Sequence, residues 1–375
     1  MNKFPIRVLM IGPSIYTIGD SGHSTFAIWR ELKKGFDQLK VFARAQGRGG
    51  TWRRDGVEVE LIRGVRRREL EFVATQFALV KRGYEYNPDV VVSQGVALGG
   101  WAAIAIGRIC KVGTLIEVHS DDFVYRASFF SRNGVMQFLS GPVFSRASLI
   151  RVLSERMGEA LVAIYGEHLR DRIRVLPPRV DTERFQPPAN RKAPDGTLEL
   201  AIVGRLCENK GQLRLINALA TANIPVTLHI FGDGPDRFAI EHAAEQVRQS
   251  PLKIIIHGLV THDKLAEALK RCDALIMYSI NEGTPRAIME AMAMGLPVIT
   301  TNAGFCADIV TDGKEGIVLS SDPDSDLRGH LEALLADPAR IAIMGDAALR
   351  RARAEFSGHI LYPRYRELIA EAAIK

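Results

Sequence analysis

Residues 281–299 read NEGTPRAIMEAMAMGLPVI, and this stretch contains a complete connection from a loop through a helix to a strand. Thr284 and Pro285 form a helix-start signal, because threonine is a favoured N-cap and proline fits the first helical position. Small residues then continue to Gly295, where a glycine predicts the end of the helix, and an apolar run follows. The stretch predicts one unit of an alternating helix and strand architecture.

Two glutamates lie eight residues apart in this stretch. Glu282 falls in the loop, and Glu290 falls roughly one and a half turns into the helix. Carboxylates accept hydrogen bonds from neighbouring hydroxyl groups, so the pair suits two parts of one elongated, sugar-containing ligand. The alternative is a solvated loop glutamate and a second glutamate that pairs with a nearby cation.

The same alternation extends through the whole chain of 375 residues. Runs of Val, Ile and Leu separated by helical patterns predict parallel strands covered on both faces. Five prolines within residues 177–194 indicate a linker between two domains. We therefore expect two Rossmann-like, doubly wound α/β domains at residues 1–180 and 197–355, a linker at 181–196, and a C-terminal helix at 356–375.

The composition is that of a soluble globular protein, with 47% hydrophobic and 25% charged residues. The longest nearly apolar stretch, residues 96–107, is far shorter than the ~20 residues of a spanning helix. We expect a cytoplasmic protein without a signal peptide. The four cysteines form no CxxC pair, so neither a disulfide framework nor a metal site is expected.

Positive charge is concentrated in the first half of the chain. Residues 1–180 carry 27 of the 49 Lys and Arg but 17 of the 43 Asp and Glu, which leaves 22 and 26 for residues 181–375. This asymmetry indicates an anionic partner, such as lipid head groups or a charged acceptor, although a solvated basic face is an equal alternative. Aromatic residues are only 7%, which disfavours nucleic acid. The arginines we assign to this surface are Arg53, Arg54, Arg66, Arg67 and Arg68.

A loop after a predicted strand, residues 204–211, reads GRLCENKG. Gly204 allows close approach of a ligand to the backbone, and Arg205 and Lys210 supply two cations suited to a diphosphate. The loop matches neither the Walker A nor the GxGxxG pattern, which disfavours an NAD-type site. A surface turn with solvated cations is the alternative.

Two segments of the first half carry further candidates. His119 follows a predicted strand within EVHSDD, residues 117–122, although a lone histidine there is more often structural. Gly22 lies in the segment GDSGHS, residues 19–24, which could admit a ligand or be a plain loop. Neither segment contains a DxD metal motif.

Together these motifs resemble the retaining glycosyltransferases of family 4, which have the GT-B fold. The resemblance is strongest from Gly204 to Val318, where the G-R-L…K-G loop, an F-G-x-G-P turn and the E-x7-E segment occur in the family's order. It implies two Rossmann-like domains that face a central cleft, and a C-terminal helix that packs back on the first domain. The chain departs from the usual pattern at Arg286-Ala287, where many members have Gly-Leu.

The resemblance also implies roles for the candidate residues. Arg205 and Lys210 hold the donor diphosphate, Glu290 binds the ribose, and Glu282 binds hydroxyls of the transferred sugar. His119 corresponds to the family's active-site histidine, and Gly22 to a glycine near the donor phosphate. The residues implied to bind the donor are Gly22, Gly204, Arg205, Lys210, Glu282, Gly283, Thr284, Pro285 and Glu290; those implied in catalysis are His119, Arg205, Lys210 and Glu282.

The expected function is therefore hexosyl transfer from a UDP- or GDP-sugar, without a metal or other cofactor. The expected acceptor is an anionic or membrane-surface glycan or glycolipid of the cell envelope, which would put the protein at the inner face of the cell membrane. The alternatives are a sugar isomerase or phosphorylase of the same fold, and a catalytically inactive lipid-binding protein.

Overall fold

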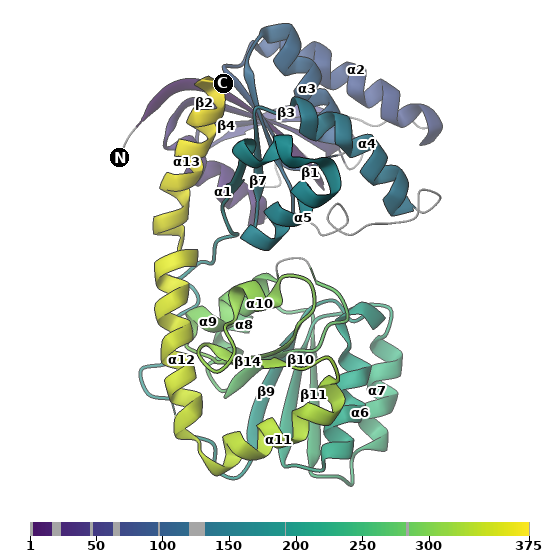
Figure 1. Ribbon diagram of the computed structural model, residues 1–375, viewed down its shortest axis with the longest axis vertical. Coiled ribbons are helices and arrows are strands. Elements are labelled where there is room, and N and C mark those ends of the chain that lie inside the picture. The colour runs from purple at the N-terminus through teal and green to yellow at the C-terminus, as the bar shows by residue number, and fades with distance from the viewer. Residues whose placement is uncertain are drawn as a thin grey trace. The chain divides into compact units, whose positions relative to one another are not determined.

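The computed structural model describes residues 3–16, 24–45, 48–62, 68–96, 98–119, 132–191, 193–282 and 285–374. The chain divides into two compact units, each with its own sheet. The first comprises Met1–Pro177 together with Leu361–Lys375, and the second comprises Pro178–Ile360 (Figure 1). The prediction of two doubly wound α/β domains is confirmed.

The first unit contains an eight-stranded sheet in the order β3-β4-β2-β1-β5-β6-β7-β8. All pairings are parallel except that of the edge strand β3 with β4. The strands are β1 (Phe4–Tyr16), β2 (Phe36–Ala45), β3 (Gly50–Arg54), β4 (Val57–Ile62), β5 (Val90–Ser93), β6 (Gly113–Glu117), β7 (Leu149–Val152) and β8 (Ile173–Val175).

Helices cover this sheet, and the last one comes from the far end of the chain. The C-terminal helix α13 shares a core cluster with α1 and the central strands. Its backbone comes so close to β6 that a Cβ on Gly113 would lie 1.7 Å from the carbonyl oxygen of Ala372. The helices are α1 (Ser24–Lys33), α2 (Arg68–Tyr86), α3 (Leu98–Cys110), α4 (Arg132–Arg146), α5 (Glu155–Tyr165) and α13 (Gly358–Ile374).

The second unit contains six parallel strands in the order β11-β10-β9-β12-β13-β14. The order reverses between β9 and β12, so the chain winds outward from the middle of the sheet in both directions. The strands are β9 (Leu198–Val203), β10 (Val226–Phe231), β11 (Leu252–Gly258), β12 (Ala274–Met277), β13 (Val298–Thr301) and β14 (Gly316–Leu319).

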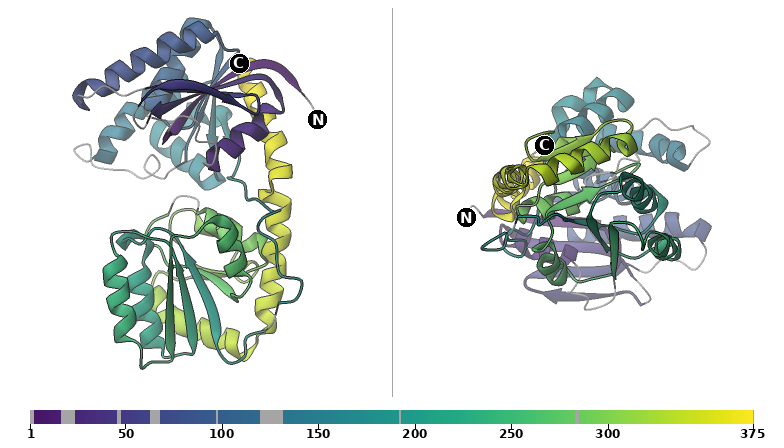
Figure 2. Two further views of the ribbon diagram at one scale, coloured as in Figure 1. Left: turned by 180° about the vertical axis from the view of Figure 1, so that it is seen from behind. Right: turned by 90° about the horizontal axis from the view of Figure 1, so that it is seen from below.

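Two core clusters lie on opposite faces of this sheet. One packs α6, α7 and α11 against the strands, and the other packs α8, α9 and α10. Seen from behind in Figure 2, α6 and α7 lie side by side next to the green strands. The helices are α6 (Gln212–Ala222), α7 (Arg237–Gln246), α8 (His262–Leu269), α9 (Arg286–Ala293), α10 (Cys306–Ile309), α11 (Pro323–Ala336) and α12 (Ala339–Arg351).

Two elements of the first unit have only a weak signal in the sequence. Strand β3 contains two arginines in five residues, and its position at the sheet edge explains how those charges are tolerated. Helix α4 contains Pro142, which weakens its helical pattern in the sequence. No helix within the described ranges is long and apolar enough to span a bilayer.

A truncation in α13 tests how far the first unit depends on the C-terminal helix. Ile369 is fully buried, so Ile369→Ala should destabilise this unit by about 2–5 kcal/mol through lost apolar burial and a residual cavity. Ile374, on the same helix, is 88% exposed, so Ile374→Ala should change stability by less than about 0.5 kcal/mol. Urea unfolding followed by circular dichroism measures both; equal effects would contradict the packing of α13 as part of this core.

Candidate functional site

The reversal of strand order in the second unit creates a pocket of about 430 Å³ at the carboxyl ends of its strands. Ligands of open parallel sheets bind at such a point, because the loops on either side diverge there. The volume lies within the ordinary range for small-molecule sites. The lining comes from the loops after β9, β10 and β11, from the end of β12, and from the first turns of α8 and α9.

Backbone hydrogen bonds fix the loops that line this pocket. The loop after β12 is tied to the loop after β9 because the Ile280 amide donates to the Asn209 carbonyl at 2.9 Å. The Asn209 side-chain amide donates in turn to the Asn281 carbonyl, also at 2.9 Å. Two loops about seventy residues apart in the chain therefore form one wall.

The two predicted cations of the pocket differ in their partners. Arg205 is exposed, and its guanidinium makes no ion pair with any residue in the described ranges. Lys210 is only 25% exposed and forms an ion pair with Glu282. An anion in the pocket would therefore meet one uncompensated charge from Arg205 and one charge that Lys210 shares with a carboxylate.

Glu282 is a buried loop residue, with only 6% of its side chain exposed. It accepts hydrogen bonds from Lys210 and, at 3.0 Å, from the Ser279 hydroxyl. The Thr301 hydroxyl donates to the Ser279 carbonyl at 2.7 Å, which anchors this segment to the end of β13. The alternative of a solvated Glu282 is therefore wrong for this structure, because the carboxylate is held by Lys210 from the loop after β9 and by Ser279 of its own loop.

Gly304 is required for this arrangement. It has φ +54°, and a Cβ at this position would lie 1.4 Å from the carbonyl oxygen of Glu282. A side chain cannot be accommodated against backbone at that distance, so glycine allows the two loops to touch.

Glu290 extends from the second turn of α9 into the pocket lining. Its side chain is 12% exposed and lies 3.8 Å from the His262 ring. Burial raises the pKa of the Glu290 carboxyl, and the positive charges of Arg286, His262 and Arg184 oppose this effect only in part. Ionisation of Glu290 at neutral pH therefore lowers the stability of the folded protein.

One wall of the pocket is apolar. Phe231, Val260, Leu265 and Met277 contribute to the lining, and Leu259, which is 83% exposed, stands at its edge. An apolar wall beside a carboxylate and two cations matches the three parts of a nucleoside diphosphate: a base, a ribose and two phosphates.

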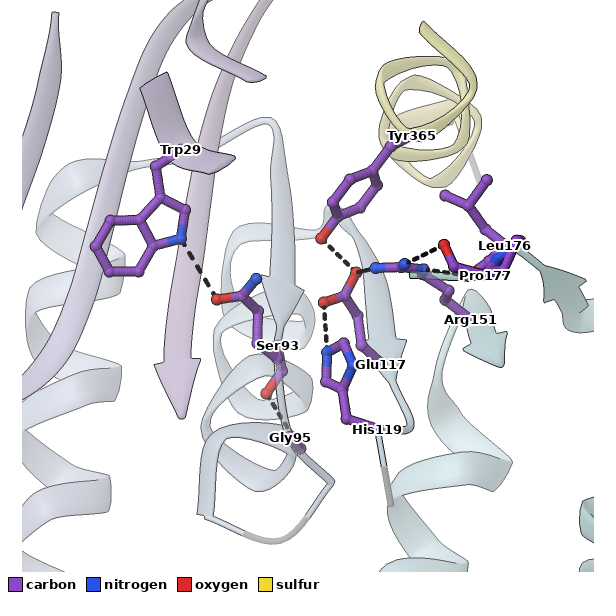
Figure 3. A network of polar contacts seen from close by, with 10 residues as sticks. Trp29, Ser93, Gly95, Glu117, His119, Arg151, Leu176, Pro177 and Tyr365 are labelled. Carbon is purple, nitrogen blue, oxygen red and sulfur yellow. Dashed lines mark hydrogen bonds and ion pairs between the residues drawn. The ribbon is translucent and has the colours of Figure 1, made fainter. Parts of the chain in front are cut away.

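The first unit has its own polar cluster, around His119 (Figure 3). The His119 ring lies 3.1 Å from the carboxylate of Glu117, the last residue of β6. Glu117 is fully buried and is also contacted by Arg151 of β7 at 2.9 Å and by the hydroxyl of Tyr365 of α13. Burial opposes the ionisation of Glu117, but the Arg151 charge and the hydrogen bonds from His119 and Tyr365 outweigh it and hold the pKa at about 2.

Several predicted residues are not gathered at either place. Arg53 and Arg54 lie on the edge strand β3, where Arg53 pairs with Glu58 and Arg54 lies 4.0 Å from Asp55. Arg68 begins α2, and its side chain is not described. Pro285, the expected first helical residue, is the N-cap of α9, so the helix begins one residue later, at Arg286. Gly22, Arg66, Arg67, Gly283 and Thr284 lie outside the described residues.

Two family models match consecutive parts of the chain. The model of the glycosyl transferase 4-like domain matches residues 21–179, and that of glycosyl transferases group 1 matches residues 184–351, which includes the whole pocket. The chain belongs to the group 1 glycosyltransferases.

Curated relatives of this glycosyltransferase family agree with that assignment. A D-inositol 3-phosphate glycosyltransferase of Pseudarthrobacter chlorophenolicus is 30% identical over 54% of this chain and 51% of its own length. A sulfoquinovosyl transferase of Arabidopsis thaliana is 25% identical over 70% of this chain and 53% of its own length. The matched region thus spans about half the length of these relatives.

Solved structures of glycosyltransferases share the complete fold. Sucrose-phosphate synthase from Thermosynechococcus elongatus superposes with a TM-score of 0.80 at 19% identity, over 97% of this chain and 99% of that one. HepE of Anabaena, solved in complex with UDP, gives a TM-score of 0.75 at 17% identity over the same shares. The fold is therefore GT-B, as the sequence motifs predict.

Sequence reasoning missed several residues of the site in this family member. Ser279 and His262 contact the two predicted glutamates, and Arg151 and Tyr365 contact Glu117. Only one signal was available: Glu117 and His119 are two positions apart at a strand end, which places both on one face. The partners of Glu117 on β7 and α13 follow from the fold alone.

Replacing Gly304 tests the loop contact that holds Glu282. Gly304→Ala should destabilise the second unit by about 1–3 kcal/mol more than Gly313→Ala, because the new Cβ collides with the Glu282 carbonyl. Gly313 is a matched control: its φ is +71°, so it has the same backbone strain, but no atom lies within 4 Å of its added Cβ. Chemical unfolding of both variants measures the difference, and equal losses would contradict the contact.

Proposed function

We propose that this protein is a retaining glycosyltransferase that transfers a sugar from a UDP-sugar to an acceptor. The observation that carries the proposal is the pocket at the strand-order reversal, which combines an apolar wall, the buried carboxylate of Glu290 and the cations Arg205 and Lys210. UDP is the first nucleotide to test because HepE, which has the same fold, was solved with UDP and with UDP-glucose. GDP is the alternative base.

In this proposal each pocket residue binds one part of the donor. Arg205 and Lys210 bind the diphosphate, and their charges stabilise it as it leaves. Glu290 accepts hydrogen bonds from the ribose hydroxyls. Glu282 binds hydroxyls of the transferred sugar while it keeps its hydrogen bond from Ser279. The backbone of Gly204 and of the segment Gly283 to Pro285 approaches the phosphates and the sugar.

The proposed reaction retains the anomeric configuration without a protein nucleophile. The bond from the anomeric carbon to the diphosphate breaks, and the acceptor hydroxyl attacks from the same face. The leaving diphosphate oxygen takes the hydroxyl proton, so atoms and charge balance without a further group. His119 and Gly22 of the first unit are assigned to the sugar and phosphate side of the donor.

For the acceptor we propose an anionic or membrane-surface glycan or glycolipid. The support is the excess of positive charge in residues 1–180, which contain 27 Lys and Arg but only 17 Asp and Glu. Arg53 contributes little, because it is paired with Glu58. The proposal therefore rests mainly on Arg66, Arg67 and Arg68.

Glu290→Gln tests the ribose assignment. The variant keeps the shape of the side chain but loses one acceptor and the charge, so UDP should bind about tenfold more weakly, measured by calorimetry. Glu267→Gln, at a 72% exposed position on α8, is the matched control and should bind UDP normally. Unchanged UDP affinity in Glu290→Gln would refute the assignment.

The same variant should be more stable than the wild type without ligand. The raised pKa of Glu290 means that the folded state binds this proton more tightly than the unfolded chain does. Ionisation therefore destabilises the fold, and the cost grows as pH rises through the folded pKa. Glu290→Gln should raise the melting temperature at about pH 8, and its advantage should shrink as pH falls below the folded pKa.

The acceptor proposal is tested by a triple variant in which Arg66, Arg67 and Arg68 are all replaced with Gln. The acceptor KM should rise, or binding to vesicles that contain phosphatidylglycerol should fall, by roughly a hundredfold at low salt, since each of the three basic residues contributes about 1 kcal/mol near an anionic surface. A charge-matched control neutralises Arg271, Arg328 and Arg340, three exposed residues of the second unit. If both triple variants behave alike, the proposed surface is wrong.

A further inference from the structure

The polar cluster around His119 in the first unit links a buried carboxylate to an exposed side chain. Glu117 is fully buried, yet its carboxylate is contacted by side chains from three other places: β7, the segment after β6, and the C-terminal helix α13 (Figure 3). One of these side chains, His119, is 41% exposed, so the cluster connects the protein interior to the surface where the substrate is proposed to bind.

The two oxygens of Glu117 have different tasks. Oε1 accepts from Arg151 Nη1 at 2.9 Å and from the Tyr365 hydroxyl. Oε2 faces His119 Nε2 at 3.1 Å. Two donors thus occupy one oxygen, and the histidine has the other.

Arg151 is held in place by contacts of its own. Its Nε donates to the Leu176 carbonyl at 3.0 Å, and its Nη2 donates to the Pro177 carbonyl at 3.2 Å. The guanidinium also lies 4.6 Å from the centre of the Tyr365 ring. A permanently charged group with fixed geometry therefore stands beside the carboxylate.

These contacts determine which nitrogen of His119 carries the proton. Glu117 stays ionised despite its burial, as its pKa of about 2 indicates. An ionised carboxylate only accepts hydrogen bonds, so the nitrogen that faces it must donate. Nε2 of His119 therefore carries a hydrogen, and Nδ1 is the ring nitrogen that has no hydrogen-bond partner among the described residues.

We propose that Glu117 is a positioning residue that fixes the orientation and the Nε2–H form of His119, and that Arg151 and Tyr365 act through it. The C-terminal helix thereby contributes to the site by way of Tyr365. This inference deepens the proposed function and rests on it, because it gives His119 a defined state in which Nδ1 meets the donor sugar.

Glu117→Gln should move the proton of the neutral His119 ring from Nε2 to Nδ1. Arg151 and Tyr365 both donate to Oε1, so the amide oxygen must take that place and the amide nitrogen must face His119. That nitrogen donates to Nε2, which moves the proton of a neutral ring to Nδ1. The shape and volume of the side chain are almost unchanged.

Nitrogen-15 NMR of the histidine rings at about pH 9, where imidazoles are generally neutral, distinguishes the two forms. His119→Asn assigns the signal. We expect Nε2–H in the wild type and Nδ1–H in Glu117→Gln. The matched control is Glu315→Gln, a buried glutamate of the second unit that pairs with Arg351, and it should leave the His119 signal unchanged. Nε2–H in Glu117→Gln, or Nδ1–H in the wild type, would overturn the inference.

Tyr365→Phe provides a second test that does not depend on the folding of Glu117→Gln. In the wild type the Hε2 proton of His119 should exchange slowly with water, because it is bonded to a buried carboxylate. Loss of the tyrosine hydroxyl removes one hydrogen bond to Glu117, so in this variant the Hε2 signal should disappear at a higher pH than in the wild type during acid titration. The same acid limit in both proteins would count against the role of Tyr365.

Donor turnover separates this inference from the proposed function. With UDP-glucose as the probe, Glu117→Gln should lower the kcat of UDP release at least tenfold and change KM less than about twofold. If Glu117→Gln keeps the wild-type kcat although its His119 carries the proton on Nδ1, the positioning role is overturned. Failure of the wild type to bind or turn over any nucleotide sugar would refute the proposed function, while the NMR result would still decide the state of His119.

Discussion

Parallel pairing of β9 with β12 is the constraint on which the nucleotide-sized pocket depends. Leu200 and Ala201 of β9 pair with Ala274 and Leu275 of β12, although the two strands are separated by two other strands in the chain. Their carboxyl ends therefore meet at one edge of the sheet. The loops that follow them, with Arg205 and Lys210 on one side and Glu282 on the other, are brought together by this pairing and by the Ile280 and Asn209 hydrogen bonds.

Charge in this pocket is balanced unequally, and the inequality suits a ligand that is anionic at one end and rich in hydroxyls at the other. Lys210 is neutralised by Glu282, whereas Arg205 has no acidic partner among the described residues. Glu290 is buried without full compensation, so its ionised form destabilises the fold. Ionisable groups whose pKa is shifted by burial are concentrated at binding and catalytic sites.

Glu117 of the first unit differs from Glu290 in this respect. Its buried glutamate is fully compensated, since Arg151, Tyr365 and His119 satisfy both oxygens of Glu117. A buried charge is tolerated only when it is paired and hydrogen-bonded, and this one is. The partners of Glu117 come from a strand, a loop and the C-terminal helix. The carboxylate that the exposed His119 contacts is therefore held in place by distant parts of the chain.

The sequence by itself determined the alternation of strands and helices, the presence of a helix that begins within one residue of Pro285, and the identity of the charged loop residues. These are local properties: side-chain periodicity and backbone preferences act within a few residues. Glu282 and Lys210 could be named in this way because each stands in a recognisable loop. Strand β3 and helix α4 could not, because their local patterns are weakened by arginines and by Pro142.

Only the tertiary structure decided which of these residues meet. Lys210 and Glu282 are 72 residues apart, and Tyr365 and Glu117 are 248 residues apart. No local preference specifies such contacts; they follow from the order of strands in each sheet and from the return of α13 to the first unit. The burial of Glu117, Glu282 and Glu290 has the same origin, since a carboxylate in a sequence is charged and solvated until the packing around it decides otherwise.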